Sequence, residues 1–153
     1  MPAYGDKGSL IYETGSRYDR WQKPVVAGIL AMTFIPGVVL LPTDRAAGLY
    51  LLGLTLFDAL LFKAIIPRRF QLYEHRLRIE LGGPFAINIR LANIRAARLA
   101  PGRKSWVYSG VRLATSSSYV VEIVLHRGLS LVISPADDTF LEQLNRRLAA
   151  ISG

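Results

Sequence analysis

The chain is organised around VVAGILAMTFIPGVVLL (residues 25–41) and AAGLYLLGLTLFDALLFKAII (residues 46–66). The first run has no charged residue in 17 positions, and the second has two in 21. A helix needs about 20 apolar residues to cross a hydrocarbon core about 30 Å thick. Because only residues 42–45 separate the two runs, they predict a transmembrane helical hairpin over residues 25–66.

Two other interpretations fit part of this pattern. A pair of buried helices in a soluble protein would normally keep a polar stripe at helical spacing, and neither run has one. A signal peptide is the second alternative for the first run. That run is long for such a segment, however, and no Ala-x-Ala site follows it. An uncleaved membrane anchor is therefore the favoured interpretation.

The basic residues around the two runs predict their orientation. Residues 1–24 contain four Lys and Arg residues, and Arg68, Arg69, Arg76 and Arg78 follow the second run, whereas the connecting turn contains Arg45 alone. Positively charged flanks of membrane helices stay in the cytoplasm. Both termini are therefore expected in the cytoplasm.

Length and composition limit the rest of the chain. With residues 25–66 in the membrane, residues 1–24 form a cytoplasmic N-terminal arm, expected to be largely irregular. Residues 67–153 are enough for one small cytoplasmic domain. The sequence of 153 residues contains no cysteine, which excludes disulfides, thiolate metal sites and thiol nucleophiles.

From residue 67 the apolar residues alternate, which is typical of strands. About seven strands are expected, at residues 69–73, 76–81, 85–90, 94–99, 106–114, 119–125 and 129–133. The last two form a hairpin through His126, Arg127 and Gly128, with the glycine free to adopt a positive φ. A helix is then expected to begin with Ser134 as N-cap and Pro135 in its first position. Its apolar face comprises Phe140, Leu141, Leu144, Leu148 and Ile151.

A family resemblance is carried by two segments and two sets of apolar residues. These are YEHRLRI (residues 73–79), LVISP (residues 131–135), the pair Ile89 and Ile94, and the trio Phe140, Leu141 and Leu144. They resemble the bacterial PH-domain (pleckstrin-homology-like) family, whose members often have two membrane helices ahead of the barrel. The resemblance covers about residues 25–152. It implies a membrane α+β protein of the bacterial inner (cytoplasmic) membrane. Its hairpin precedes a PH-like antiparallel β-barrel that a C-terminal helix closes.

The resemblance also implies a scaffold or recognition domain without enzymatic activity. Eukaryotic relatives of this fold often bind phosphoinositides through basic residues between the first strands. The corresponding turn here, residues 82–84, contains no Lys or Arg, which argues against a specific phosphoinositide pocket.

The positive charge is concentrated after the hairpin. Residues 67–115 contain ten basic and two acidic residues, and each Lys or Arg near an anionic membrane contributes about 1 kcal/mol of attraction. The candidate lipid-headgroup contacts are Arg68, Arg69, Arg95, Arg98, Arg103 and Lys104. A basic flank is equally expected from membrane topology alone. Nucleic acid is not an expected partner, because the anchor brings the lipid surface closer than any other polyanion.

The second apolar run contains three polar residues, Thr55, Asp58 and Lys63. Lys63 is near enough to the inner end to extend its amine to the interface. Asp58 lies just past the middle, where an unpaired acid is costly. It indicates either a proton or ion site or a polar contact to the first helix, a second copy or a partner subunit, and the contact is favoured. Small residues that would let helices approach closely are Ala27, Gly28, Ala31, Gly48 and Gly53.

No catalytic or metal-binding pattern is present. The two histidines, His75 and His126, have no metal-ligand spacing, and the serines at 116–118 lack the setting of an activated nucleophile. No cofactor, metal or enzymatic activity is therefore expected. The leading hypothesis is an accessory or assembly subunit of a larger membrane complex, with lipids and other subunits or a second copy as partners. The alternatives are a sensor of anionic lipid and a component of an ion or proton pathway through Asp58.

Overall fold

The computed structural model describes residues 8–100 and 110–152. The chain forms two compact units. One unit is the segment Arg20–Ile66, and the other combines the residues up to Asp19 with those from Pro67 onward. Each unit is described by itself below.

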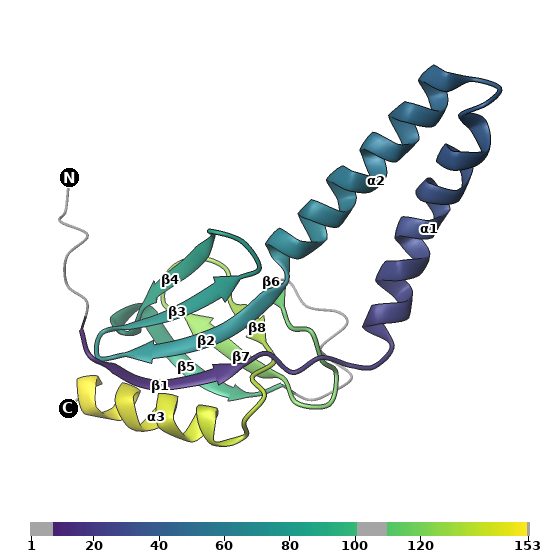
Figure 1. The fold of residues 1–153 in the computed structure, drawn as a ribbon. Coiled ribbons are helices and arrows are strands. Elements are labelled where there is room, and N and C mark those ends of the chain that lie inside the picture. Colours follow the sequence, from purple (N-terminus) through teal and green to yellow (C-terminus); the bar gives the residue numbers. More distant parts are fainter. Residues whose placement is uncertain (1–7, 101–109, 153) are drawn as a thin grey trace, which may run out of the picture. The chain divides into compact units, whose positions relative to one another are not determined.

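The first unit is a helical hairpin of α1 (Gln22–Leu40) and α2 (Arg45–Ile65), which run antiparallel beside one another (Figure 1). The Asp44 carboxylate accepts a hydrogen bond from the backbone N–H of Ala47 (3.1 Å) and so caps the start of α2. Pro36 lies within α1. Both helices are long and apolar enough to cross a membrane, and only 6% of the apolar window in each is buried.

The second unit contains two four-stranded sheets. The first is antiparallel and has the order β1 (Leu10–Gly15), β2 (Pro67–Tyr73), β3 (Arg76–Leu81) and β4 (Ala86–Arg90). The expectation of an irregular N-terminal arm is therefore wrong for Leu10–Gly15. This strand pairs with β2, so that Thr14 lies opposite Phe70. Its partner is more than fifty residues away, and tertiary context of this kind overrides local propensity.

The second sheet has the order β5 (Ile94–Leu99), β7 (Val121–Leu125), β8 (Leu131–Ile133) and β6 (Val111–Leu113). The strands β6 and β8 run parallel, in contrast to the expected all-antiparallel arrangement. The 3₁₀-helix η1 (Leu91–Asn93) separates β4 from β5, so the chain leaves one sheet and enters another. The two sheets do not join into one, and the prediction of a closed barrel is wrong.

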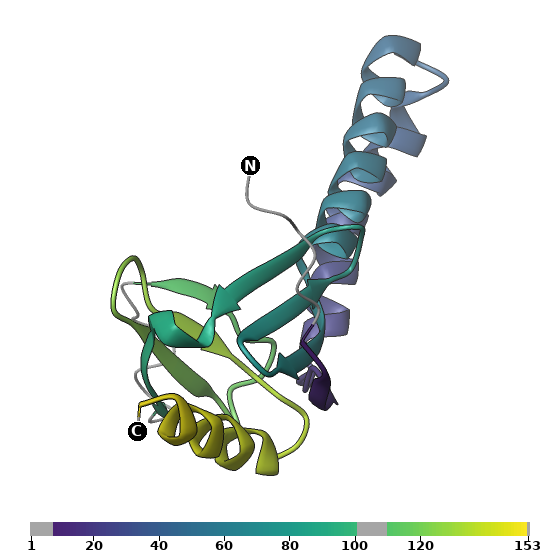
Figure 2. The same ribbon diagram turned by 90° about the vertical axis from the view of Figure 1, so that its left-hand side faces the viewer.

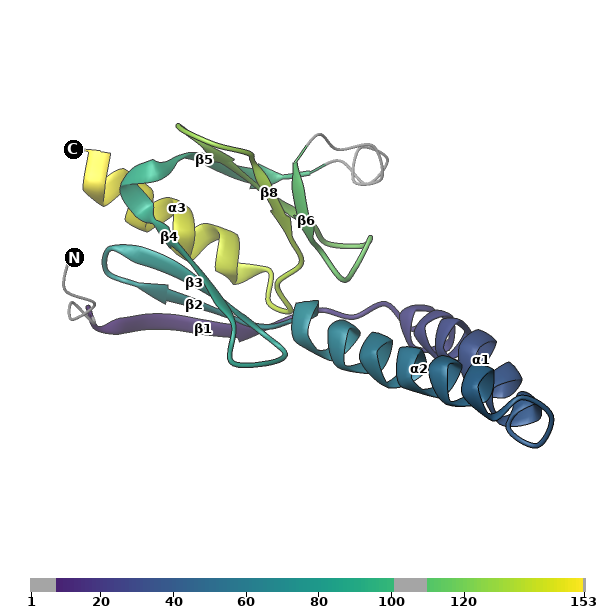
Figure 3. The same ribbon diagram turned by 90° about the horizontal axis from the view of Figure 1, so that it is seen from above.

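A single apolar core lies between the two sheets and α3 (Thr139–Ser152). Leu77 and Ile79 of β3 are fully buried, as their alternation predicts, and so are Phe140 and Leu144 on the predicted apolar face of α3. Leu141 and Leu148 pack against the edge of the core, whereas Ile151 is exposed. Figures 2 and 3 show the helix beside both sheets, with contacts to β1, η1 and β5.

The start of α3 differs from the expectation. The helix begins at Thr139, and the Asp137 carboxylate accepts a hydrogen bond from the Thr139 N–H (3.0 Å). Ser134 is fully buried, and its hydroxyl donates to the carbonyl of Ser116 (3.2 Å). Pro135 forms a β-bridge with Ser16. The Ser134 carbonyl accepts a hydrogen bond from the Arg17 N–H (2.9 Å), so both residues hold the N-terminal segment against the domain instead of starting the helix.

Candidate functional site

Glycines and threonines form the contact between α1 and α2. Gly37 and Gly48 are buried, and a Cβ atom on Gly48 would lie 2.9 Å from the Gly37 carbonyl oxygen and from the Leu41 nitrogen. The Thr55 hydroxyl lies 2.8 Å from the Thr33 hydroxyl. Of the small residues noted in the sequence, Gly48 makes the close backbone approach. Gly28 and Gly53 have open space where a Cβ would be.

Asp58 lies one turn after Thr55 on the same face of α2, because residues three apart are neighbours on a helix. It is half-buried, and it forms no hydrogen bond or ion pair with any residue that the structure describes. Lys63 is exposed and does not pair with it. The structure thus shows how Thr55 is used within the hairpin, and it leaves the carboxylate of Asp58 without a partner among residues 8–100 and 110–152.

The basic residues singled out as lipid contacts lie in two different sheets. Arg68 and Arg69 belong to β2, and Arg95 and Arg98 belong to β5. Arg69 forms an ion pair with Glu13 (3.1 Å) and Arg98 one with Glu122 (2.6 Å), which reduces the positive charge available to a ligand. Arg103 and Lys104 lie outside the described residues.

Arg68 and Arg95 are exposed and form no ion pair within the described part of the chain. The four described residues of the predicted set are therefore divided between two sheets.

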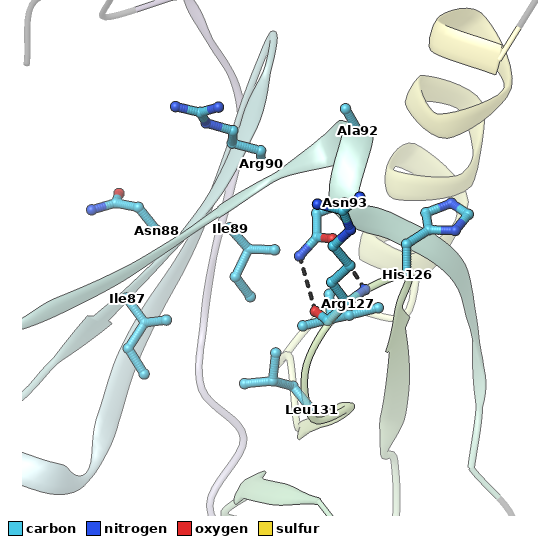
Figure 4. Close-up of a pocket in the computed structure, with 10 residues that line it drawn as sticks. Ile87, Asn88, Ile89, Arg90, Ala92, Asn93, His126, Arg127 and Leu131 are labelled. Atoms are coloured by element: carbon cyan, nitrogen blue, oxygen red, sulfur yellow. Dashed lines mark hydrogen bonds between the residues drawn. The ribbon is translucent and has the colours of Figure 1, made fainter. Parts of the chain in front are cut away.

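An open hollow of about 650 Å³ lies between β4 and the β7–β8 hairpin (Figure 4). On one side it is lined by Ile87 to Arg90, and on the other by Leu125, His126 and Arg127. Leu131, Ala92 and Asn93 complete the lining. Gly128, at the tip of the hairpin, has a φ of 97°, as the predicted turn requires.

Asn93 ties the two sides of this hollow together. Its side-chain amide donates to the carbonyl of Arg127 (3.3 Å), and its carbonyl oxygen accepts from the Arg127 N–H (3.3 Å). Arg127 and His126 are the basic residues at its rim, the Arg90 guanidinium points away from it (Figure 4), and none of the described lining residues is acidic. The sequence shows these residues only as strand ends and a turn, and the topology brings them together.

The serines at 116–118 have a structural role. The carboxylate of Asp19 accepts hydrogen bonds from the hydroxyls of Ser116 (2.7 Å) and Ser117 (2.8 Å) and from the Ser117 N–H (2.8 Å). This network fastens the segment before α1 to the loop between β6 and β7. It gives Ser116 and Ser117 an ordered polar contact.

A second polar cluster links β1 to the start of α3. The phenol of Tyr12 donates to the carboxylate of Asp137 and lies 2.7 Å from the Thr139 hydroxyl. The hydrogen bond from Tyr12, followed by those from Thr139, lowers the pKa of Asp137, and the same bond to Asp137 raises the pKa of Tyr12. The cluster therefore favours an ionised carboxylate beside a protonated phenol.

This cluster predicts a pH dependence of stability. Because the pKa of Asp137 is lower in the folded chain, its stabilising contribution is present above the ordinary value of about 4 and is lost as the pH falls through the lower folded value. The melting temperature is therefore expected to fall less steeply between pH 5 and pH 2 in Tyr12→Phe than in the unmodified protein. Tyr73→Phe is the control, since the Tyr73 phenol contacts the neutral amide of Gln71. If the melting temperature changes equally with pH in all three proteins, the role given to the hydrogen bond between Tyr12 and Asp137 is contradicted.

No group of three or more His, Asp or Glu side chains among the described residues is arranged to hold a metal ion. The chain gives no significant match to protein-family models, to curated proteins or to solved structures.

Proposed function

We propose that this chain is a non-catalytic, membrane-anchored interaction module, an accessory or assembly subunit of a larger membrane complex. The hairpin would lie in a bacterial cytoplasmic membrane, with both termini in the cytoplasm. Two apolar helices with little burial support insertion, and basic residues on both flanks of the hairpin support the orientation. Two helices ahead of most of the strands, and a C-terminal helix after them, support the likeness to bacterial PH-domain proteins, although β1 precedes the helices.

Asp58 is the observation that carries this proposal. An acid in the middle of a membrane helix is costly unless it is paired or faces protein or water. The hairpin supplies a threonine pair one turn away, but no described donor reaches the carboxylate. A donor on a helix of another protein would complete the site, which favours assembly with a partner in the membrane.

Removing the carboxylate is expected to weaken this assembly. A polar contact between membrane helices contributes about 1–2 kcal/mol, so Asp58→Leu should retain a partner about five- to thirty-fold less well. The measurement is the molar ratio of co-purified partner after extraction in mild detergent. Phe57→Leu, at a neighbouring exposed position, is the matched control and should keep the ratio of the unmodified protein. An unchanged ratio in Asp58→Leu would contradict the proposal.

Asp58→Asn separates this contact from a proton pathway. Asparagine can still form a hydrogen bond but cannot titrate. If the complex keeps both its composition and its activity with Asp58→Asn, the pathway hypothesis is removed and the contact remains.

A second candidate function is binding of anionic lipid, favoured by Arg68 and Arg95, which are exposed and form no ion pair with a described residue. The full chain is needed for the test, since β1 is part of the sheet. In nanodiscs, replacing a third of the phosphatidylcholine by phosphatidylglycerol should slow amide exchange in β2 and β5. Raising the salt concentration should abolish the difference, because salt screens exposed charges. Arg68→Gln combined with Arg95→Gln should also abolish it, and insensitivity to lipid charge would remove this function.

A further inference from the structure

One edge of β4 has no strand beside it among the described residues, because β4 ends the first sheet. In an antiparallel pair, hydrogen-bonded residue pairs alternate with non-hydrogen-bonded ones. The N–H of Leu81 bonds to the carbonyl of Phe85 (3.0 Å), and that of Leu91 bonds to the carbonyl of His75 (2.9 Å). With this register the N–H and C=O groups of Ile87 and Ile89 face β3. The outward-facing backbone groups therefore belong to Ala86, Asn88 and Arg90, of which the Arg90 carbonyl is used as the N-cap of η1 and its N–H remains outward.

A free row of alternating donors and acceptors is a template for an additional strand. The side chains of β4 fit the same arrangement. Ile87 and Ile89 point toward the hollow, whereas Asn88 and Arg90 point away from it (Figure 4). Leu131 and Leu125 line the opposite side. A strand lying along β4 would place every second side chain among these apolar groups.

The charge of the hollow limits what such a strand can carry. Arg127 and His126 line it, the Arg90 guanidinium lies on the opposite, outward face of β4, and none of the described lining residues is acidic. The residues of an added strand that lie beside Asn88 and Arg90 would be on the same face as the Arg90 guanidinium. Opposite charges in neighbouring positions across strands stabilise a sheet, and like charges destabilise it. An acidic segment is therefore the complementary occupant.

We propose that the open edge of β4 binds an extended segment of a partner protein in which apolar and acidic residues alternate. The segment adds to the first sheet beside β4, with its apolar side chains next to Ile87 and Ile89 and its acidic side chains next to Arg90. A lipid headgroup fits less well, because a phosphate accepts hydrogen bonds but leaves the outward carbonyls of β4 unpaired. This inference rests on the proposed interaction function and gives the chemistry of the partner.

The probe is a capped peptide of about seven residues that alternates valine and aspartate, long enough to cover the five residues of β4. Amide exchange is followed by NMR on the full chain in detergent micelles. The expected result is about ten-fold slower exchange at the amides of Asn88 and Arg90, with little change at Ile87 and Ile89, which are already bonded to β3. Two control peptides should give no protection. One alternates valine and lysine, and the other has the first peptide's composition in separate valine and aspartate blocks.

Asn88→Pro is the sharpest variant. It removes an outward N–H that the fold does not use, and proline is tolerated at edge strands with that geometry. It should weaken peptide binding about ten-fold or more, whereas Asn88→Thr, which keeps the N–H, should bind normally. Should Asn88→Pro lower the melting temperature, Arg90→Gln provides the second test, with the same expected loss of affinity.

Three results would overturn the proposal. The first is equal protection of the Asn88 and Arg90 amides by the alternating valine–aspartate peptide and by the block peptide. The second is no protection of these amides by any peptide. The third is displacement of the peptide by short-chain phosphatidylglycerol with the same amides protected, which would assign the hollow to lipid. The peptide is tested on the chain alone, so its failure is separable from that of the proposed function. If a stoichiometric membrane partner is found but the peptide does not bind, only the proposal of a docking edge at β4 is rejected.

Discussion

Phe140→Ala is expected to lower the free energy of unfolding of the sheet-containing unit by about 3–5 kcal/mol, the range for truncating a buried phenylalanine. The Phe140 side chain is fully buried, and its ring centroid lies 6.1 Å from that of Phe70 and 6.3 Å from that of Tyr12. It thereby connects α3 to β2 and β1. Its removal would leave a cavity where the helix meets the first sheet.

Chemical denaturation of the purified full chain, followed by near-UV circular dichroism, measures this loss. Phe85→Ala is the matched control, since the Phe85 side chain is 60% exposed, and it should change the stability by less than about 0.5 kcal/mol. Similar effects of the two substitutions would mean that α3 does not close the core.

Gly48→Ala is expected to destabilise the helical hairpin by about 1–3 kcal/mol, the usual cost of overpacking. The added Cβ would lie 2.9 Å from the Gly37 carbonyl oxygen and from the Leu41 nitrogen. These are backbone atoms, so the clash is relieved only by moving the helices apart. Gly48→Leu should have a larger effect.

Gly53→Ala is the control for this substitution, because nothing lies within 4 Å of the added Cβ. Alanine in a helix interior is favoured over glycine by about 0.5–1 kcal/mol, so this variant should be neutral or more stable. Both are measured by titrating the protein in mild detergent with sodium dodecyl sulfate and following helix content. A Gly48→Ala variant as stable as Gly53→Ala would contradict the close approach of α1 and α2.

Local periodicity was enough to predict much of the fold. The two apolar runs predict α1 and α2, alternation identifies the buried face of β3 at Leu77 and Ile79, and helical spacing identifies Phe140 and Leu144. Local patterns do not encode long-range pairing. The position of β1 depends on β2, the parallel pairing of β6 depends on β8, and η1 lies where the chain passes from one sheet to the other.

The candidate sites also differ in how well the local sequence predicts them. Thr55 and Asp58 stand out in the sequence because polar residues are rare in such a run, and one helical turn relates them. The hollow beside β4 gives no such signal. Arg90 ends one strand and Arg127 lies in a turn 37 positions later, and only the topology places both at the same opening. The ion pairs of Arg69 and Arg98 likewise depend on neighbouring strands.

Whether the hairpin holds this chain in a membrane complex is best decided by the composition of what is extracted with it. The tagged full chain is extracted from its native membrane in mild detergent, and its mass and the molar ratios of co-purifying proteins are determined by native mass spectrometry. We expect a membrane protein in fixed ratio with the chain, and a lower ratio of that protein with Asp58→Leu. A chain that fractionates with the soluble proteins, or that is extracted alone with only lipid, would contradict it.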